Sequence, residues 1–344
     1  MPASAERPPV VLVLGLGPVG GRLAARPDLG AEIRAAEYAV PWEEISARRR
    51  GDLDGTLPEL PDTLRRDLAD ADVLFGFYLP RRLTDLAPRL RWVSTPSTGL
   101  DHLRGTGVLE SSIDVTNVGG LFGPVLAEHA FALLLHFAKR LGHFGALARA
   151  RTWRMGQVGV LQGRTLGLVG VGNIGQAVAA RAKAFEMRVL GLGRGQTAGR
   201  TVAHVDELFP RERLHDLLAA SDYVVVAVAE TPETRGMIGA AELAVMKADA
   251  VLVNVARGTV LDEPALVAAL RAERLGGAGL DVFAEEPLPA DSPLWTLPNA
   301  LVTPHVAGLV PDYMERAAVH FEANLRRFVA GEALLDRYDR RRGY

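Results

Sequence analysis

Short apolar runs alternate with longer amphipathic stretches along most of the chain. In the first third, such runs at 10–16, 73–77 and 91–94 predict buried strands. A second and clearer series begins after an irregular stretch around Trp153. Its predicted strands are 165–169, 188–192, 223–227, 250–254, 277–280 and 300–303. Because strand and helix signals alternate, both series predict doubly wound parallel sheets, the second of them with six strands.

Two long helical stretches are predicted outside these strand series. Residues 122–141 are apolar nearly all round, which predicts a long helix buried at an interface. The last helix is predicted over 312–330, and we expect it to return to the first sheet. The pattern as a whole therefore predicts an α/β chain with two domains.

Composition limits the partners of this chain. A length of 344 residues is enough for about two domains, each with its own core. The net charge of −2 gives no electrostatic case for binding nucleic acid or an acidic membrane. The absence of cysteine excludes disulfides, thiolate nucleophiles and Cys-ligated metals, and we expect no metal site. The first residues lack the basic and apolar regions of a signal peptide, so we expect a cytoplasmic protein.

A glycine motif that typically binds a dinucleotide opens the second series. In Gly170-Val-Gly172-Asn-Ile-Gly175 a strand leads directly into the turn, and an alanine-rich helix is predicted to follow up to Phe185. Gly170 would permit the tight turn, Gly172 would let the backbone approach a pyrophosphate, and Gly175 would allow close packing of helix on sheet. The N–H groups at the start of the helix would then face the phosphates.

A competing motif, Gly15-Leu-Gly17-Pro-Val-Gly20, follows the first predicted strand. Pro18 lies inside its turn, and Pro27 would cut the following helix short. We interpret this copy as a plain strand-to-helix turn, with nucleotide binding as the less favoured alternative.

The choice of cofactor depends on the end of the next strand, at 188–192. An acid there would hold the ribose hydroxyls of NAD and repel a 2′-phosphate. The chain instead has Gly193 and Arg194, and Glu186 lies at the wrong end of the strand. Arg194 would pair with a 2′-phosphate. We therefore expect NADP(H) to be preferred; if Arg194 merely stacks on the adenine, NAD(H) binds as well.

Three charged residues follow predicted strands of the second sheet. They are Arg257, Glu286 and His305. Ligands of open α/β sheets bind at this carboxyl edge. Reduction of a ketone needs a proton donor, a task suited to imidazole, and a neighbouring carboxylate favours the protonated ring. It also needs a cation that polarises the carbonyl and grips a carboxylate, for which the arginine fork is suited.

The chain resembles the D-isomer-specific 2-hydroxyacid dehydrogenase family from about Leu90 to Gly308. The matching motifs are Leu90-Arg-Trp-Val-Ser-Thr-Pro-Ser-Thr-Gly-Leu-Asp-His-Leu103, Asn117-Val-Gly-Gly120, Ala127-Glu128 and the segments around the three charged residues. The resemblance implies His305 as the acid/base, Glu286 as its partner and Arg257 as substrate anchor. The adjacent Glu285 makes the choice of Glu286 depend on motif spacing.

The resemblance also implies the remaining contacts and the domain plan. Thr98 and Gly99 would offer N–H groups to the substrate carboxylate. The expected cofactor contacts, besides the glycine motif, are Asn173, Ile174, Arg194, Val255, Ala256 and Asp281. A flavodoxin-like substrate domain, residues 1–118 and 309–344, would carry an inserted Rossmann domain, residues 119–308. Members usually form homodimers, largely through the long helix.

The expected activity is reduction of a small 2-oxo acid to the D-2-hydroxy acid, with glyoxylate or hydroxypyruvate as first candidates. Oxidation of another small anion such as phosphite is an alternative, although Glu286 argues against formate. A nucleotide-sensing regulatory protein of the co-repressor type is another, since catalytic residues can persist in such proteins.

Overall fold

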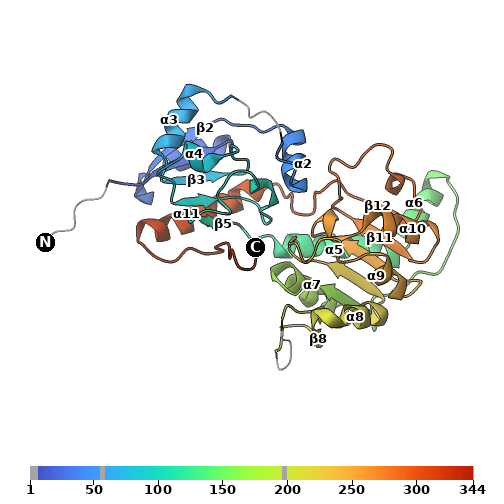
Figure 1. The fold of residues 1–344 in the computed structure, drawn as a ribbon. Helices are drawn as coiled ribbons and strands as arrows, with labels where there is room; N and C mark the ends of the chain where they lie inside the picture. Colours follow the sequence, from blue (N-terminus) through green and yellow to red (C-terminus); the bar gives the residue numbers. More distant parts are fainter. Residues whose placement is uncertain (1–6, 55–58, 196–199, 344) are drawn as a thin grey trace. The chain divides into compact units, whose positions relative to one another are not determined.

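The computed structural model describes residues 7–54, 59–195 and 200–343. The first six residues, on which the expectation about a signal peptide partly rests, lie outside this part. The chain divides into two compact units, Met1–Leu121 with Pro311–Tyr344 and Phe122–Val310 (Figure 1). Each contains a parallel sheet with helices, and the predicted fold class of two α/β parallel-sheet domains, one of them a Rossmann domain, is confirmed.

The sheet of the first unit has five strands within the described residues, in the order β2-β1-β3-β4-β5. This order is that of flavodoxin-like folds. The strands are β1 (Val10–Leu14), β2 (Glu32–Ala36), β3 (Val73–Gly76), β4 (Trp92–Ser94) and β5 (Asp114–Thr116). The helices are α1 (Pro18–Ala24), α2 (Trp42–Arg50), α3 (Asp62–Asp70), α4 (Leu83–Leu86) and α11 (Tyr313–Val329), with 3₁₀ turns at Pro27–Leu29 and Asp101–Leu103.

Helix α11, red in Figure 1, returns to this first sheet as predicted. Its Phe321 is fully buried and stacks on Phe75 of β3 with ring centroids 4.2 Å apart. Trp92 of β4 stacks on the same ring at 5.3 Å. Burial of three aromatic side chains explains why this distant segment belongs to the first core.

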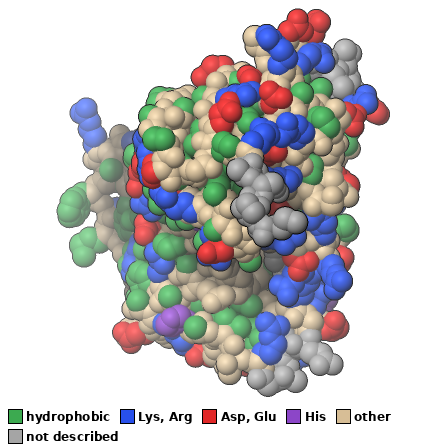
Figure 2. Space-filling view, turned by 90° about the vertical axis from the view of Figure 1, so that its left-hand side faces the viewer, with side chains coloured by type: hydrophobic (Ala, Val, Ile, Leu, Met, Phe, Trp, Pro, Cys, Tyr) green, Lys and Arg blue, Asp and Glu red, His purple; other side chains and the backbone are tan. Residues whose placement is uncertain are grey.

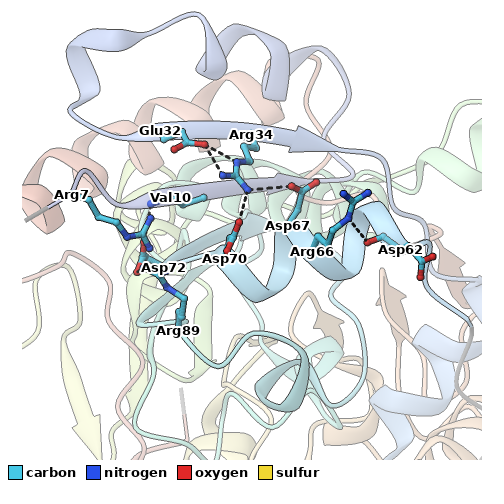
Figure 3. Close-up of polar contacts among 10 residues, drawn as sticks. All are labelled: Arg7, Val10, Glu32, Arg34, Asp62, Arg66, Asp67, Asp70, Asp72 and Arg89. Atoms are coloured by element: carbon cyan, nitrogen blue, oxygen red, sulfur yellow. Dashed lines mark hydrogen bonds and ion pairs between the residues drawn. The ribbon is translucent and has the colours of Figure 1, made fainter.

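Strand β2 was not predicted. Its side chains contact α3 mainly through charged groups, and few of them are apolar and buried. Arg34 lies in the middle of this edge strand and pairs with Glu32 and with Asp67 and Asp70 of α3 (Figure 3). Near the start of the neighbouring β1, the Asp72 carboxylate accepts the N–H of Val10 at 2.9 Å. Strand prediction from apolar residues misses a strand that ion pairs attach to the rest of the domain.

The sheet of the second unit has seven strands within the described residues, in the order β12-β11-β10-β9-β6-β7-β8. The strands are β6 (Thr165–Val169), β7 (Arg188–Leu192), β8 (Glu207–Phe209), β9 (Tyr223–Val226), β10 (Val251–Asn254), β11 (Gly277–Leu280) and β12 (Ala300–Val302). The helices are α5 (Gly123–Ala138), α6 (Leu141–Arg149), α7 (Asn173–Ala184), α8 (Leu214–Ala220), α9 (Ala240–Val245) and α10 (Glu263–Arg271). Short 3₁₀ turns lie at Arg211–Arg213, Gly258–Val260 and Pro293–Trp295.

Two predictions for this unit were wrong in detail. The expected six strands omitted β8, a three-residue edge strand that, among the described strands, pairs with β7 alone and has one buried side chain, Phe209. The long helix predicted over 122–141 ends at Ala138 instead, because Arg140 adopts a left-handed φ of 54° before α6 begins. Helix α5 buries one face, which packs against α7, β10 and β11.

Charged side chains of both signs are interspersed over the face of the molecule in Figure 2. Among the described residues, no helix combines the length and the hydropathy that a membrane crossing needs.

Candidate active site

His305 and Glu286 form a direct hydrogen-bonded pair after strands β12 and β11. The Nδ1 atom of His305 lies 2.8 Å from Oε2 of Glu286. The other carboxylate oxygen of Glu286 accepts the N–H of Phe283 at 3.1 Å, which fixes the acid in place. Because a carboxylate only accepts, Nδ1 carries the shared proton and Nε2 remains on the opposite side of the ring. The side chain of His305 is 31% exposed and that of Glu286 is 10% exposed, so the pair is shielded on the carboxylate side.

The backbone at His305 is held in a conformation that few non-glycine residues adopt. Its φ is 55°, in the left-handed region. The N–H of His305 donates to the carbonyl of Asp281 at 2.8 Å. The Asp281 carboxylate, 1% exposed, accepts the N–H groups of Val306 and Ala307, each at 2.9 Å. The loop that carries His305 is thus tied to the end of β11.

Arg257 follows β10 in a loop shaped by a buried asparagine. Asn254, fully buried at the end of β10, accepts the N–H of Ala256 at 3.0 Å and donates to the carbonyl of Arg257 at 2.9 Å. The Arg257 guanidinium donates to the carbonyl of Ala256 at 2.8 Å and is half-buried. We did not identify Asn254 from the sequence, although an amide that ends an apolar strand is a readable signal.

The loops that carry Arg257 and Glu286 lie in contact at Gly258. A methyl group added at Gly258 would come within 2.3 Å of three backbone atoms of Phe283 and Ala284. Only glycine permits this approach. Since β10, β11 and β12 are neighbours in the sheet, the three candidate catalytic residues follow three adjacent strands at one edge.

The second glycine motif has the geometry that its sequence predicts. Gly170 has a φ of 106°, and a side chain there would meet the carbonyl oxygen of Ala227 at 2.8 Å. A side chain at Gly175 would lie 2.1 Å from the carbonyl oxygen of Gly170. A methyl group at Gly172, in contrast, would meet no heavy atom within 4 Å. The turn therefore leaves open space at the N-terminus of α7, where Asn173 and Ile174 begin the helix, and it fits a pyrophosphate.

The first glycine motif is explained by packing within its own unit. Gly15 has a φ of 65°, and a side chain there would meet the carbonyl oxygen of Tyr38 at 2.4 Å. A side chain at Gly20 would lie 2.9 Å from the Cβ atom of Ala35. The helix that follows, α1, has only seven residues. A strand-to-helix turn accounts for these contacts without a ligand.

The remaining predicted cofactor contacts differ in whether their side chains or only their backbone atoms are accessible to a ligand. The side chains of Val255 and Ala256 are buried in the hydrophobic clusters of the second unit, so only their backbone is available to a ligand. Arg194 is exposed after β7. The hydrogen bond from Thr231 lowers the pKa of Glu233, with smaller contributions from the charges of Arg194 and Arg211. The Arg211 guanidinium also donates to the carbonyl of Glu233 in the loop after β9.

Thr98 and Gly99 lie in the first unit, between β4 and the turn at Asp101–Leu103. The carbonyl of Thr98 accepts from Asn117 at 2.9 Å, and that of Gly99 accepts from Ser97 at 2.8 Å. Within the described residues, no acceptor is found for the N–H groups of Thr98 and Gly99. Their predicted role toward a carboxylate stays a prediction, as does the place of Asp281 among the cofactor contacts.

Comparison with known proteins identifies the family. A family model described as D-isomer specific 2-hydroxyacid dehydrogenase, NAD binding domain, matches residues 131–307. The glyoxylate reductase of Korarchaeum cryptofilum is 36% identical over 302 residues, 86% of this chain and 86% of that protein. This chain belongs to the D-isomer-specific 2-hydroxyacid dehydrogenase family. It is an NAD(P)-dependent oxidoreductase, as the sequence motifs predicted.

Solved structures of the family cover nearly the whole chain. A family member from Aeromonas salmonicida has a TM-score of 0.79 and 30% identity, over 97% of this chain and 100% of that one. The NADPH-dependent glyoxylate/hydroxypyruvate reductase of Sinorhizobium meliloti, in complex with NADP and sulfate, has a TM-score of 0.77 and 27% identity. That comparison covers 98% of this chain and 100% of the other.

Proposed function

We propose that this chain reduces a small 2-oxo acid to the corresponding D-2-hydroxy acid. The observation that carries the proposal is the 2.8 Å contact between His305 and Glu286, beside the loop that presents Arg257. The similarity to glyoxylate reductases, which extends over most of the chain, supports a 2-oxo acid as the substrate.

In this mechanism His305 supplies the proton and Glu286 stabilises the charged ring. A nicotinamide cofactor held at the Gly170–Gly175 turn would supply the hydride that C2 of the oxo acid accepts. As the carbonyl π bond breaks, the oxygen takes the proton from Nε2 of His305, so that one C–H and one O–H bond form. Glu286 holds the ring through Nδ1, so that Nε2 faces away from the carboxylate.

Arg257 would anchor the substrate carboxylate and polarise the carbonyl through its planar fork. As the family resemblance implies, we propose that the N–H groups of Thr98 and Gly99 bind a substrate carboxylate. We assign the substrate domain to residues 1–118 and 309–344 and the nucleotide domain to residues 119–308, and we take glyoxylate and hydroxypyruvate as the first candidate substrates.

We further propose that NADP(H) is preferred and that NAD(H) is also bound. Gly193 at the tip of β7 provides no carboxylate to repel a 2′-phosphate, and Arg194 beside it is exposed. The Arg211 guanidinium, which donates to the carbonyl of Glu233 in the loop after β9, adds a second cation. Arginine side chains of this kind favour the phosphorylated cofactor.

We also propose a homodimer. The segment after α6 exposes large apolar side chains, with Trp153 95% and Met155 88% exposed, and Leu141 at the start of α6 is 53% exposed. Apolar exposure of this extent is typical of a surface that a partner covers. A second copy of this chain is the occupant that the family resemblance implies.

The test is the rate of NADPH and NADH consumption with glyoxylate, hydroxypyruvate, pyruvate and a branched 2-oxo acid, followed by chiral analysis of the product. We expect turnover that is faster with NADPH, yields the D-isomer and is abolished in His305→Ala. Tight cofactor binding without turnover on any of the acids would contradict the proposal and would favour a regulatory protein or oxidation of another anion.

A further inference from the structure

We infer that His129 of α5 is a positioning residue for His305, acting through Thr303 and Asp281. This inference rests on the proposed role of His305 as the proton donor. His129 lies in sequence far from the motifs that surround the catalytic residues, and the function described above gives it no role.

The link begins at the strained backbone of His305. A non-glycine residue at a φ of 55° persists only where its surroundings hold it there. Here the restraint is the Asp281 carboxylate, which accepts two N–H groups directly after His305. The orientation of the His305 ring toward Glu286 therefore depends on where the Asp281 side chain lies.

The Asp281 carboxylate is in turn fixed from the side of α5. Oδ1 of Asp281 accepts the hydroxyl of Thr303 at 2.6 Å, and the Nε2 atom of His129 lies 3.0 Å from that hydroxyl oxygen. The same Nε2 atom is 3.5 Å from Oδ1 of Asp281. Because a carboxylate is an acceptor only, Thr303 donates to Asp281, and its oxygen is left to accept from His129. The hydrogen bonds thus run in one direction, from His129 through Thr303 to Asp281.

Because Asp281 is buried, the loss of one hydrogen bond in this series should change the position of its carboxylate. Asp281 is 1% exposed, and a buried carboxylate is costly unless its oxygens are satisfied. Removal of the His129 imidazole leaves Thr303 without its donor and opens space on one side of the carboxylate. The loop at 303–307 then gains freedom, and displacement of a catalytic group by about 1 Å can cost up to roughly a hundredfold in rate.

The test compares His129→Ala and His129→Gln with a matched control, His136→Ala. His136 lies two turns further along α5 on nearly the same face and is also half-buried, but its ring packs beside Phe137 at 5.1 Å. Glutamine can place an amide N–H near the position of the His129 Nε2 atom. Two readouts are combined: kcat and KM for oxo acid and NADPH, and the NMR signal of the hydrogen-bonded His305 Nδ1–H, assigned by its loss in His305→Ala.

We expect kcat of His129→Ala to fall about tenfold, the size of one lost hydrogen bond in a charged network. The KM for NADPH should stay within about twofold, the Nδ1–H signal should weaken or disappear, and His129→Gln should restore much of both. His136→Ala should leave kcat and the signal unchanged.

An unchanged kcat and an unchanged Nδ1–H signal in His129→Ala would overturn the inference, even if the melting temperature falls, because a purely structural role predicts that pattern. If the wild type turns over no oxo acid, the proposed function fails. The NMR signal in the wild type and in His129→Ala still decides whether His129 positions His305.

Discussion

Gly172 allows the proposed nucleotide site to be tested almost independently of the fold. It caps α7 with φ −72° and ψ −162°, which alanine also adopts. The added methyl group would meet no heavy atom within 4 Å. The folded protein should therefore accept Gly172→Ala, whereas a pyrophosphate close to this turn should not.

The two effects differ in size. Replacing glycine by alanine at a helix N-cap costs about 1 kcal/mol or less, which lowers Tm by only a few degrees in a domain of this size. Displacing a phosphate from the helix N-terminus removes at least one charge-assisted hydrogen bond, about 1.5–3 kcal/mol. Cofactor binding should therefore weaken by roughly 10- to 150-fold.

The assay is NADPH binding, measured by fluorescence or calorimetry, together with a thermal melt. Gly21→Ala is the matched control, since Gly21 lies in α1 directly after the other glycine motif and a methyl group there also meets no heavy atom within 4 Å. It should bind NADPH as the wild type does. A Kd for Gly172→Ala within about threefold of the wild-type value, or equal weakening in both variants, would refute the assignment of the site.

Three further predictions concern single charged residues. Arg194→Ala should lower the preference for NADPH over NADH by about tenfold, by loss of one charged hydrogen bond, and unchanged Kd values for both would contradict this. Arg257→Lys should lower kcat/KM by roughly tenfold or more because lysine cannot form the bidentate contact; near-wild-type kinetics would exclude the anchor role. Burial alone would raise the pKa of Asp222, but hydrogen bonds from Lys247 and the Thr165 N–H lower it. Its stabilisation is thus present above about pH 4 and lost as pH falls further, so Asp222→Asn should unfold more easily by about 1–3 kcal/mol at pH 7, and the gap to wild type in denaturant melts should close below pH 4. If the difference in unfolding free energy between Asp222→Asn and the wild type does not depend on pH, the Asp222 carboxylate is not the source of this stabilisation.

The inner strands β6, β9, β10 and β11 of the second sheet were predictable because nearly all of their side chains are buried. β6 and β10 are continuous apolar runs that end in turns, which the sequence displays directly. Strand β8 was missed because an edge strand of three residues with one fully buried side chain carries little pattern. Strand β2 was missed because Arg34 and its acidic partners, which are distant in sequence, attach it to α3.

The candidate site was predictable where one motif carries both the residue and its surroundings. Glu286 and His305 stand in such motifs, and in the structure Nδ1 of His305 lies 2.8 Å from Oε2 of Glu286. The contact of His129 with Thr303 joins residues 174 positions apart, and no local pattern reveals it.

We propose that His305 donates the proton in reduction of a 2-oxo acid. This role is tested by kcat of His305→Ala with NADPH and the best oxo acid, together with the Kd for NADPH of the same variant. We expect kcat to fall by about 10²–10⁴-fold, the usual contribution of general acid catalysis, with little change in Kd. A kcat within a few-fold of the wild type would contradict it.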